Sequence, residues 1–143
     1  MHRCSGGNIR VRSLELFALA AAIRLTASAQ DLGALTGAYA ANPGMATRSA
    51  LLRYAAAHND TSGALALLAV SHQDVQGDRR GEALRNLEAA APRLPQLADY
   101  ITWLSASARF ANREFDAAAA ACETVLKQQP KSPLAAQAAM LAG

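Results

Sequence analysis

Two short stretches of the sequence hold the residue types that nucleophilic catalysis uses. Ser71 and His72 are adjacent and precede Asp74, and His58 lies two residues before Asp60. A serine nucleophile needs a histidine base that a carboxylate orients, and the three side chains must converge in space. Neighbouring residues of a helix point in different directions, so Ser71 and His72 do not fit this geometry. We therefore expect structural roles for these residues and no catalytic residue among them.

Those structural roles follow from the positions of the residues in the helices we expect. His58 falls in the last turn of one helix, where the helix dipole favours a histidine, and Asp60 is placed to cap the next helix. His72 falls at the seam of its helix and is predicted to be partly buried.

The two cysteines, Cys4 and Cys122, do not form a recognisable metal or redox motif. The sequence contains no C-x-x-C pair and no Cys/His spacing typical of a zinc site. No histidine is placed to activate Cys122, so we expect it to be a small core residue and not a catalytic thiol. The sequence thus predicts no catalytic, cofactor-binding or metal-binding residues and no cofactor.

The first 29 residues have the layout of a secretory signal peptide. "MHRCSGGNIRVR" carries three arginines, an apolar run covers residues 16–23, and Ala27-Ser28-Ala29 forms an A-x-A cleavage site before Gln30. Because Glu15 opens the run and Arg24 closes it, an amphipathic helix of the mature domain remains the alternative. The run is shorter than the roughly 20 residues that a membrane span needs. We expect a periplasmic mature protein without a membrane span.

The positive charge of the chain belongs to this leader. The chain has 14 Lys and Arg against 11 Asp and Glu, a net charge of +3. Residues 1–29 hold four arginines and one glutamate, so the remaining chain has ten basic and ten acidic side chains. A nucleic-acid-binding domain concentrates basic residues on one face. We therefore expect no nucleic-acid partner.

Composition and periodicity predict an all-α fold. The sequence is 52% hydrophobic but only 5% aromatic, and residues 117–121 are five consecutive alanines. Alanine favours helix but buries little area, so such a helix must lie close to its neighbours. We expect a linker or N-terminal segment over 30–46 with a loop at 42–44. Helices are expected over about 47–58, then from capping residues at 60–62 to an end at 77–78, and over about 81–94, 97–110 and 115–129, with another beginning at Ser132-Pro133.

The last part of the chain contains an internal repeat. Four positions recur 35 residues later, namely Gly77/Asn112, Ala83/Ala118, Glu88/Glu123 and Pro95/Pro130. This offset is close to the period of about 34 residues of tetratricopeptide arrays. Ala83 and Ala118 are placed where paired helices approach most closely, and Trp103 is expected to be a core or inter-repeat residue. The sequence predicts tetratricopeptide-like helix pairs over 47–143 that form a short α-solenoid, truncated at its C-terminal end.

Residues 65–143 also resemble a known family. "LPQLADY" before a helix, the turn from Gly77 to Ala83 and "QPKSPLAAQA" are similar to the N-terminal helical-repeat region of bacterial soluble lytic murein transglycosylases. The resemblance implies a curved periplasmic superhelix that joins a lysozyme-like domain, and that domain cleaves peptidoglycan with one catalytic glutamate.

The catalytic elements of that family are missing from the sequence. None of the glutamates is followed by serine, no Gly-Leu-Met-Gln stretch occurs, and the sequence ends at "AQAAMLAG" within a helix. We therefore expect a scaffold fragment of such an enzyme that is inactive by itself, with peptidoglycan reached through the missing domain. The alternative is a free-standing tetratricopeptide-repeat module that binds a protein or peptide partner on its concave face.

Overall fold

The described part of the protein, residues 31–142 of a computed structural model, is all-helical. The expected signal peptide and Cys4 lie outside the described residues. A helix over residues 31–41 comes first. It is followed by α2 (Met45–Ala57), α3 (Thr61–Gln76), α4 (Arg80–Ala90), α5 (Ala98–Ala111), α6 (Phe115–Gln128) and α7 (Ala135–Ala142). The short 3₁₀ turns Ala91–Arg93 and Pro95–Leu97 connect α4 to α5. The all-α prediction is confirmed.

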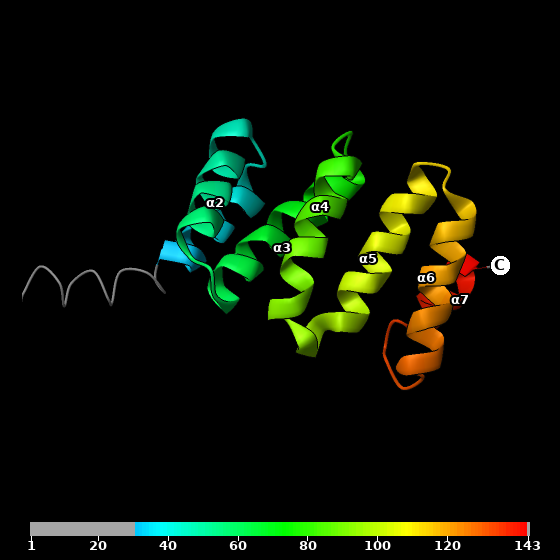
Figure 1. Cartoon of the computed structure of the whole chain (residues 1–143). Helices are drawn as coiled ribbons and strands as arrows, with labels where there is room; N and C mark the ends of the chain where they lie inside the picture. Colours follow the sequence, from blue (N-terminus) through cyan, green and yellow to red (C-terminus); the bar gives the residue numbers. More distant parts are fainter. Residues whose placement is uncertain (1–30, 143) are drawn as a thin grey trace, which may run out of the picture.

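The helices stand side by side in chain order, and successive helices run in opposite directions (Figure 1). Each labelled helix packs against the next one, and α3 also contacts α5 while α5 contacts α7. We call the helix 31–41, α3 and α5 the first helices, and α2, α4 and α6 the second helices. Within the described residues, no helix is long and apolar enough to cross a membrane.

Local side-chain chemistry explains where α2 ends and α3 begins. The Asp60 carboxylate accepts hydrogen bonds from the amides of Ser62 and Gly63 at 2.9 and 3.2 Å, which satisfies two free N–H groups of α3. His58 caps the C-terminus of α2, and its ring stacks on Tyr54 with 3.9 Å between the ring centroids. The predicted capping role of Asp60 is confirmed, whereas His58 lies at the C-cap, one residue beyond the last turn in which it was expected.

Two predicted helix boundaries and one predicted segment differ from the structure. Helix α4 stops at Ala90, not at residue 94, and Pro92 lies in the 3₁₀ turn that follows. Helix α7 begins at Ala135 because Pro133 lies in a turn, where the Ser132 hydroxyl accepts a hydrogen bond from the Leu134 amide at 3.1 Å. The segment 30–46, for which we expected only a linker or N-terminal segment, is helical over 31–41.

The helix 31–41 forms because its apolar residues recur at helical spacing. Leu32, Leu35 and Tyr39 lie on one face and pack in a cluster with residues of α2 and α3. Tyr39 is buried at 5% exposure, although it is close to the N-terminal end of the described chain.

The core consists of three thin clusters between neighbouring helices. One joins α3, α4 and α5, the second joins the helix 31–41 to α2 and α3, and the third joins α5, α6 and α7. Half-buried Trp103 packs against the first and third clusters. Cys122 is fully buried in the third cluster, and burial raises the pKa of its thiol. Its predicted role as a small core residue is confirmed.

Alanine allows the paired helices to lie close together. Ala83 and Ala118 are both completely buried. The Ser71 hydroxyl of α3 lies 3.4 Å from the Ala83 carbonyl oxygen of α4, so a small polar side chain spans the distance between the two helices. The buried, close-contact role expected of Ala83 and Ala118 agrees with this packing.

Candidate functional site

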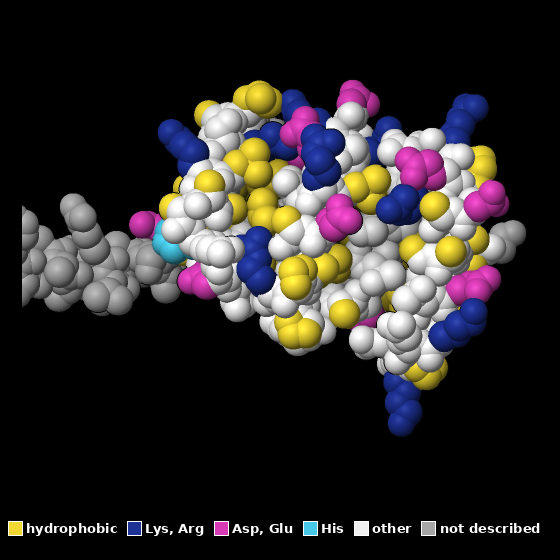
Figure 2. All heavy atoms as spheres, in the orientation of Figure 1, with side chains coloured by type: hydrophobic (Ala, Val, Ile, Leu, Met, Phe, Trp, Pro, Cys, Tyr) yellow, Lys and Arg dark blue, Asp and Glu magenta, His cyan; other side chains and the backbone are white. Residues whose placement is uncertain are grey.

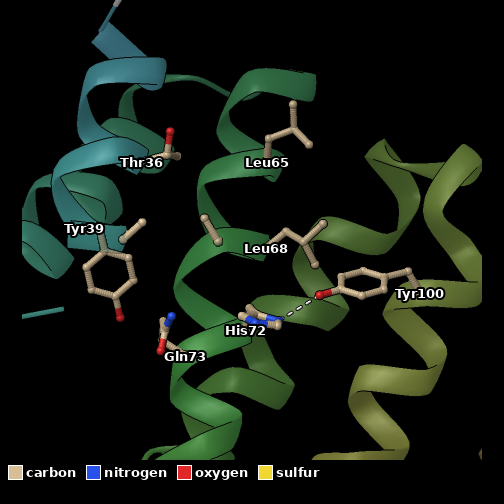
Figure 3. A pocket seen from close by; sticks show the side chains of 9 residues that line it. Thr36, Tyr39, Leu65, Leu68, His72, Gln73 and Tyr100 are labelled. Carbon is tan, nitrogen blue, oxygen red and sulfur yellow. Dashed lines mark hydrogen bonds between the residues drawn. The ribbon is translucent and has the colours of Figure 1, made fainter. Parts of the chain in front are cut away.

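A hollow of about 390 Å³ opens along the first helices (Figure 3). The helix 31–41 supplies one wall, α3 supplies the floor, and one residue of α5 supplies the other wall. The lining residues are Thr36, Tyr39, Ala40, Leu65, Leu68, Ala69, His72, Gln73 and Tyr100. We call this hollow the first-helix groove. Its lining contains no Asp, Glu, Lys or Arg.

The floor of the groove is aliphatic. Leu65, Leu68 and Ala69 follow one another at helical spacing and therefore share one face of α3. Leu68 is nearly buried, but Leu65 is 38% exposed and is among the large apolar side chains that meet solvent. Leu65 therefore adds exposed apolar surface to the groove.

His72 and Tyr100 join α3 to α5 across the groove. The Tyr100 hydroxyl lies 2.8 Å from His72 Nδ1 in a hydrogen bond whose direction depends on the histidine tautomer. Burial raises the pKa of Tyr100, so its hydroxyl stays protonated at neutral pH. His72 is half-buried, as predicted, and its ring is held in place by this bond (Figure 3).

The residues that suggested a catalytic triad have separate partners. The Ser71 hydroxyl donates to the Leu67 carbonyl oxygen at 2.8 Å, whereas His72 bonds to Tyr100. The Asp74 carboxylate pairs with Arg48 instead of approaching His72. The three side chains therefore do not converge as a nucleophile, a base and an orienting acid would.

Sequence reasoning missed an ion cluster in which the buried Arg48 and Asp74 are joined by the half-exposed Glu82. Arg48 and Asp74 are 6% and 3% exposed, and their closest nitrogen and oxygen atoms are 2.6 Å apart. The signal was present in the sequence. Arg48 precedes Ala83 by 35 residues, which is the offset that separates Ala83 from Ala118. Arginine at a position that otherwise holds alanine indicates a special contact.

A second hollow, of about 310 Å³, continues from the first-helix groove. Both hollows are lined by Tyr39 and Gln73, and the second is also lined by Asp74, Asp78 and Arg79. The groove thus passes from an uncharged apolar part to a polar part. On the face drawn in Figure 2, basic and acidic side chains are interspersed, in line with the even charge balance of residues 30–143.

The described residues contain no group of three or more His, Cys, Asp or Glu side chains that could hold a metal ion. Comparison with known proteins gives no relatives. The chain matches no protein-family model, no curated protein and no solved structure.

Proposed function

We propose that the chain is a short array of tetratricopeptide-like helix pairs that acts as a binding and scaffold module. Two observations support the repeat. In such an array the first helix of each pair contacts the first helix of the next pair. The contacts of α3 with α5, and of α5 with α7 as the first helix of a further pair, fit this expectation. In addition, small residues occur at corresponding places in the two pairs: Ser71 and Ala83 in one, and Ala106 and Ala118 in the other.

The repeat positions follow the tetratricopeptide pattern beyond these small residues. That pattern places a small residue in the first helix, alanine and a large apolar residue four positions apart in the second helix, and then proline. Ala83 is followed by Leu87 and Pro95. Ala118 is followed at the same distances by Cys122 and Pro130. Cys122 is smaller than the apolar residue that usually stands there.

The observation that carries the binding function is the first-helix groove. It is lined only by first helices, it is concave, and its volume of about 390 Å³ lies in the range of about 300–1,000 Å³ of small-ligand sites. Its uncharged lining would impose a desolvation cost on a charged group without offering an ion partner. The occupant we propose is therefore one large, uncharged apolar side chain of a partner peptide.

The rim of the groove suits a peptide. The Thr36 hydroxyl, the Gln73 amide and the His72 ring lie around an aliphatic floor. They could bond to the N–H and C=O groups on either side of a buried side chain.

Selection from a displayed random-peptide library on the full chain tests this function. Selected peptides should share a leucine, phenylalanine or other large apolar residue. Leu65→Lys, which places a cation beside the groove, should weaken their binding at least tenfold in a fluorescence titration. Met140→Lys is the matched control because Met140 is 85% exposed on α7, away from the groove. Peptides that bind both variants equally well would exclude the groove as the site.

The resemblance of residues 65–143 favours a second candidate function. In that proposal the helices are the scaffold region of an exported lytic transglycosylase, and the catalytic domain is encoded downstream. Sequencing the gene beyond the codon for Gly143 would reveal a lysozyme-like domain. The chain by itself should release no product from peptidoglycan sacculi. N-terminal sequencing of periplasmic protein should begin at Gln30, and an intact N-terminus there would contradict export with cleavage.

A further inference from the structure

Arg48 occupies a position of the repeat that is otherwise kept small. It stands in α2 where Ala83 stands in α4 and Ala118 in α6, each 35 residues apart. The two alanines are fully buried, and Arg48 is buried as well. Burying a guanidinium is costly unless its donors are paired, so this substitution needs a specific compensation.

The compensation comes from two carboxylates on different helices. Arg48 Nε donates to Asp74 Oδ1 at 3.0 Å, and Arg48 Nη2 donates to Asp74 Oδ2 at 2.6 Å. The same Nη2 also donates to Glu82 Oε2 at 2.7 Å. Hydrogen bonding to Asp74 raises the pKa of Arg48, and hydrogen bonding to Arg48 lowers the pKa of Glu82. One side chain of α2 is therefore tied to the end of α3 and to the start of α4.

One member of this ion cluster borders the polar hollow that continues from the first-helix groove. Asp74 lines the polar hollow, and the preceding residue, Gln73, lines both hollows. Tyr39, from the helix 31–41, also lines both. The pKa of Tyr39 is raised by burial and further by the Asp74 carboxylate, so its hydroxyl lies within the field of the same cluster.

The helix 31–41 and α2 form the pair at one end of the described array, and that pair supplies a wall of the groove. Among the described helices this pair has neighbours on one side only, and an end pair opens at a lower free energy than the middle of an array. Besides the ion cluster, the pair is attached by the second cluster, in which Tyr39, Leu51 and Tyr54 meet Ala66 and Val70 of α3. The Arg79 guanidinium also contacts the Met45 sulfur at 3.0 Å.

We propose that Arg48 is a positioning residue of the groove: through Asp74 and Glu82 it holds the terminal helix pair on α3 and α4. Without Arg48 the pair opens locally and the groove loses the wall made by Thr36, Tyr39 and Ala40. The consequence for binding rests on the function proposed above, whereas the attachment of the pair does not. Removing Arg48 leaves Asp74 buried without its counter-charge, which is more damaging than removing both partners.

Hydrogen exchange measured by mass spectrometry on the full chain tests the attachment without any ligand. Arg48→Ala should speed exchange in residues 31–57 by about a hundredfold, while residues 98–128 keep their rates. Arg48→Ala with Asp74→Asn, which removes the buried charge as well, should recover much of the protection. The control is Arg109→Ala, because Arg109 forms a surface ion pair with Glu114 and is 41% exposed.

A positioning role of Arg48 predicts faster exchange only in residues 31–57, whereas a general stabilising role predicts faster exchange in every helix. Unchanged exchange in 31–57, or an equal increase in every helix, would overturn the proposal. If Arg48→Ala does not fold, Arg48→Lys keeps one cation but not the two-carboxylate contact and should show the same local pattern at a smaller factor.

A second readout uses the peptides selected on the groove, which should bind Arg48→Ala at least tenfold more weakly than the parent chain. Equal binding, with faster exchange in 31–57, would contradict the role in the groove and leave the attachment standing. If no peptide binds the parent chain, the proposed function fails, and the exchange result still decides whether Arg48 holds the pair.

Discussion

At the scale of single residues, the molecule depends on where side chains are small. Ala83 and Ala118 are completely buried between paired helices, and Ser71 is small enough to reach the Ala83 carbonyl oxygen. Such closely spaced helices leave no free volume at these positions, because interiors are packed at crystal-like density. Arg48 is accommodated at the corresponding position only because Asp74 and Glu82 receive its guanidinium.

Ala118→Leu tests the packing of the α5–α6 pair. Leucine adds volume at a fully buried position, and overpacking typically costs about 1–3 kcal/mol of stability. The control is Asp116→Leu, at an exposed residue of the first turn of α6, where the dipole contributes only about 0.3–1 kcal/mol. Thermal melts followed by circular dichroism compare both variants with the parent. If Ala118→Leu were tolerated and Asp116→Leu were destabilising, a different face of α6 would have to pack against α5.

The sequence indicates these residues to different degrees. Ala83, Ala118, Cys122 and Trp103 could be assigned to the core because repeat offset and helical spacing are local properties. The offset of 35 residues between Arg48 and Ala83 marks Arg48 as unusual but does not name its partner, because Arg48 and Asp74 are 26 residues apart and meet only when α2 packs on α3. The groove could not be assigned either, because its lining residues come from three helices that meet only in the folded chain.

At the scale of elements, helix ends are determined by caps and turns more than by periodicity. Asp60 starts α3 where expected, but the 3₁₀ turns after Ala90 and the turn at Ser132 move two boundaries. The helix 31–41 escaped prediction because its apolar stripe is short and contains two glycines, Gly33 and Gly37. It is stabilised by packing on α2 and α3, which a local pattern does not reveal.

Gly63→Ala tests the close junction between α2 and α3. A methyl group there would clash with the backbone of His58. It would lie 2.9 Å from the carbonyl carbon and closer still to the carbonyl oxygen. We expect a loss of at least about 1–3 kcal/mol, measured by urea unfolding. Gly37→Ala has no atom within 4 Å and should instead stabilise the helix 31–41 by about 0.5–1 kcal/mol. Equal effects of the two substitutions would contradict the packing at this junction.

Acid should weaken the contact between α5 and the turn that precedes α7. The Ser132 hydroxyl donates to the Asp99 carboxylate at 2.6 Å, and this bond holds the pKa of Asp99 below its usual value. Because the folded-state pKa is lowered, the stabilisation is complete above the unfolded pKa of about 3.9 and is lost as the pH falls through the folded value. Circular-dichroism melts should show a melting temperature that falls below about pH 4. Asp99→Asn should reduce that fall, and a melting temperature that rises on acidification would contradict this assignment.

At the scale of the whole molecule, the first helices together line a concave groove without Asp, Glu, Lys or Arg. On the surface drawn in Figure 2, acidic and basic side chains are scattered among apolar ones. Composition and helical periodicity predicted the all-helical fold, but not where a concave surface would be apolar. The apolar lining of the groove comes from three helices, between Thr36 and Tyr100 in the sequence. It forms only when these helices pack together.

The central claim is that the first-helix groove receives an apolar peptide side chain. It is tested most directly by mapping a selected peptide onto the chain through changes in backbone amide NMR resonances. The account predicts changes concentrated at residues 36–40, 65–73 and 100, from the helix 31–41, α3 and α5. Changes concentrated on the second helices, α2, α4 and α6, would contradict it.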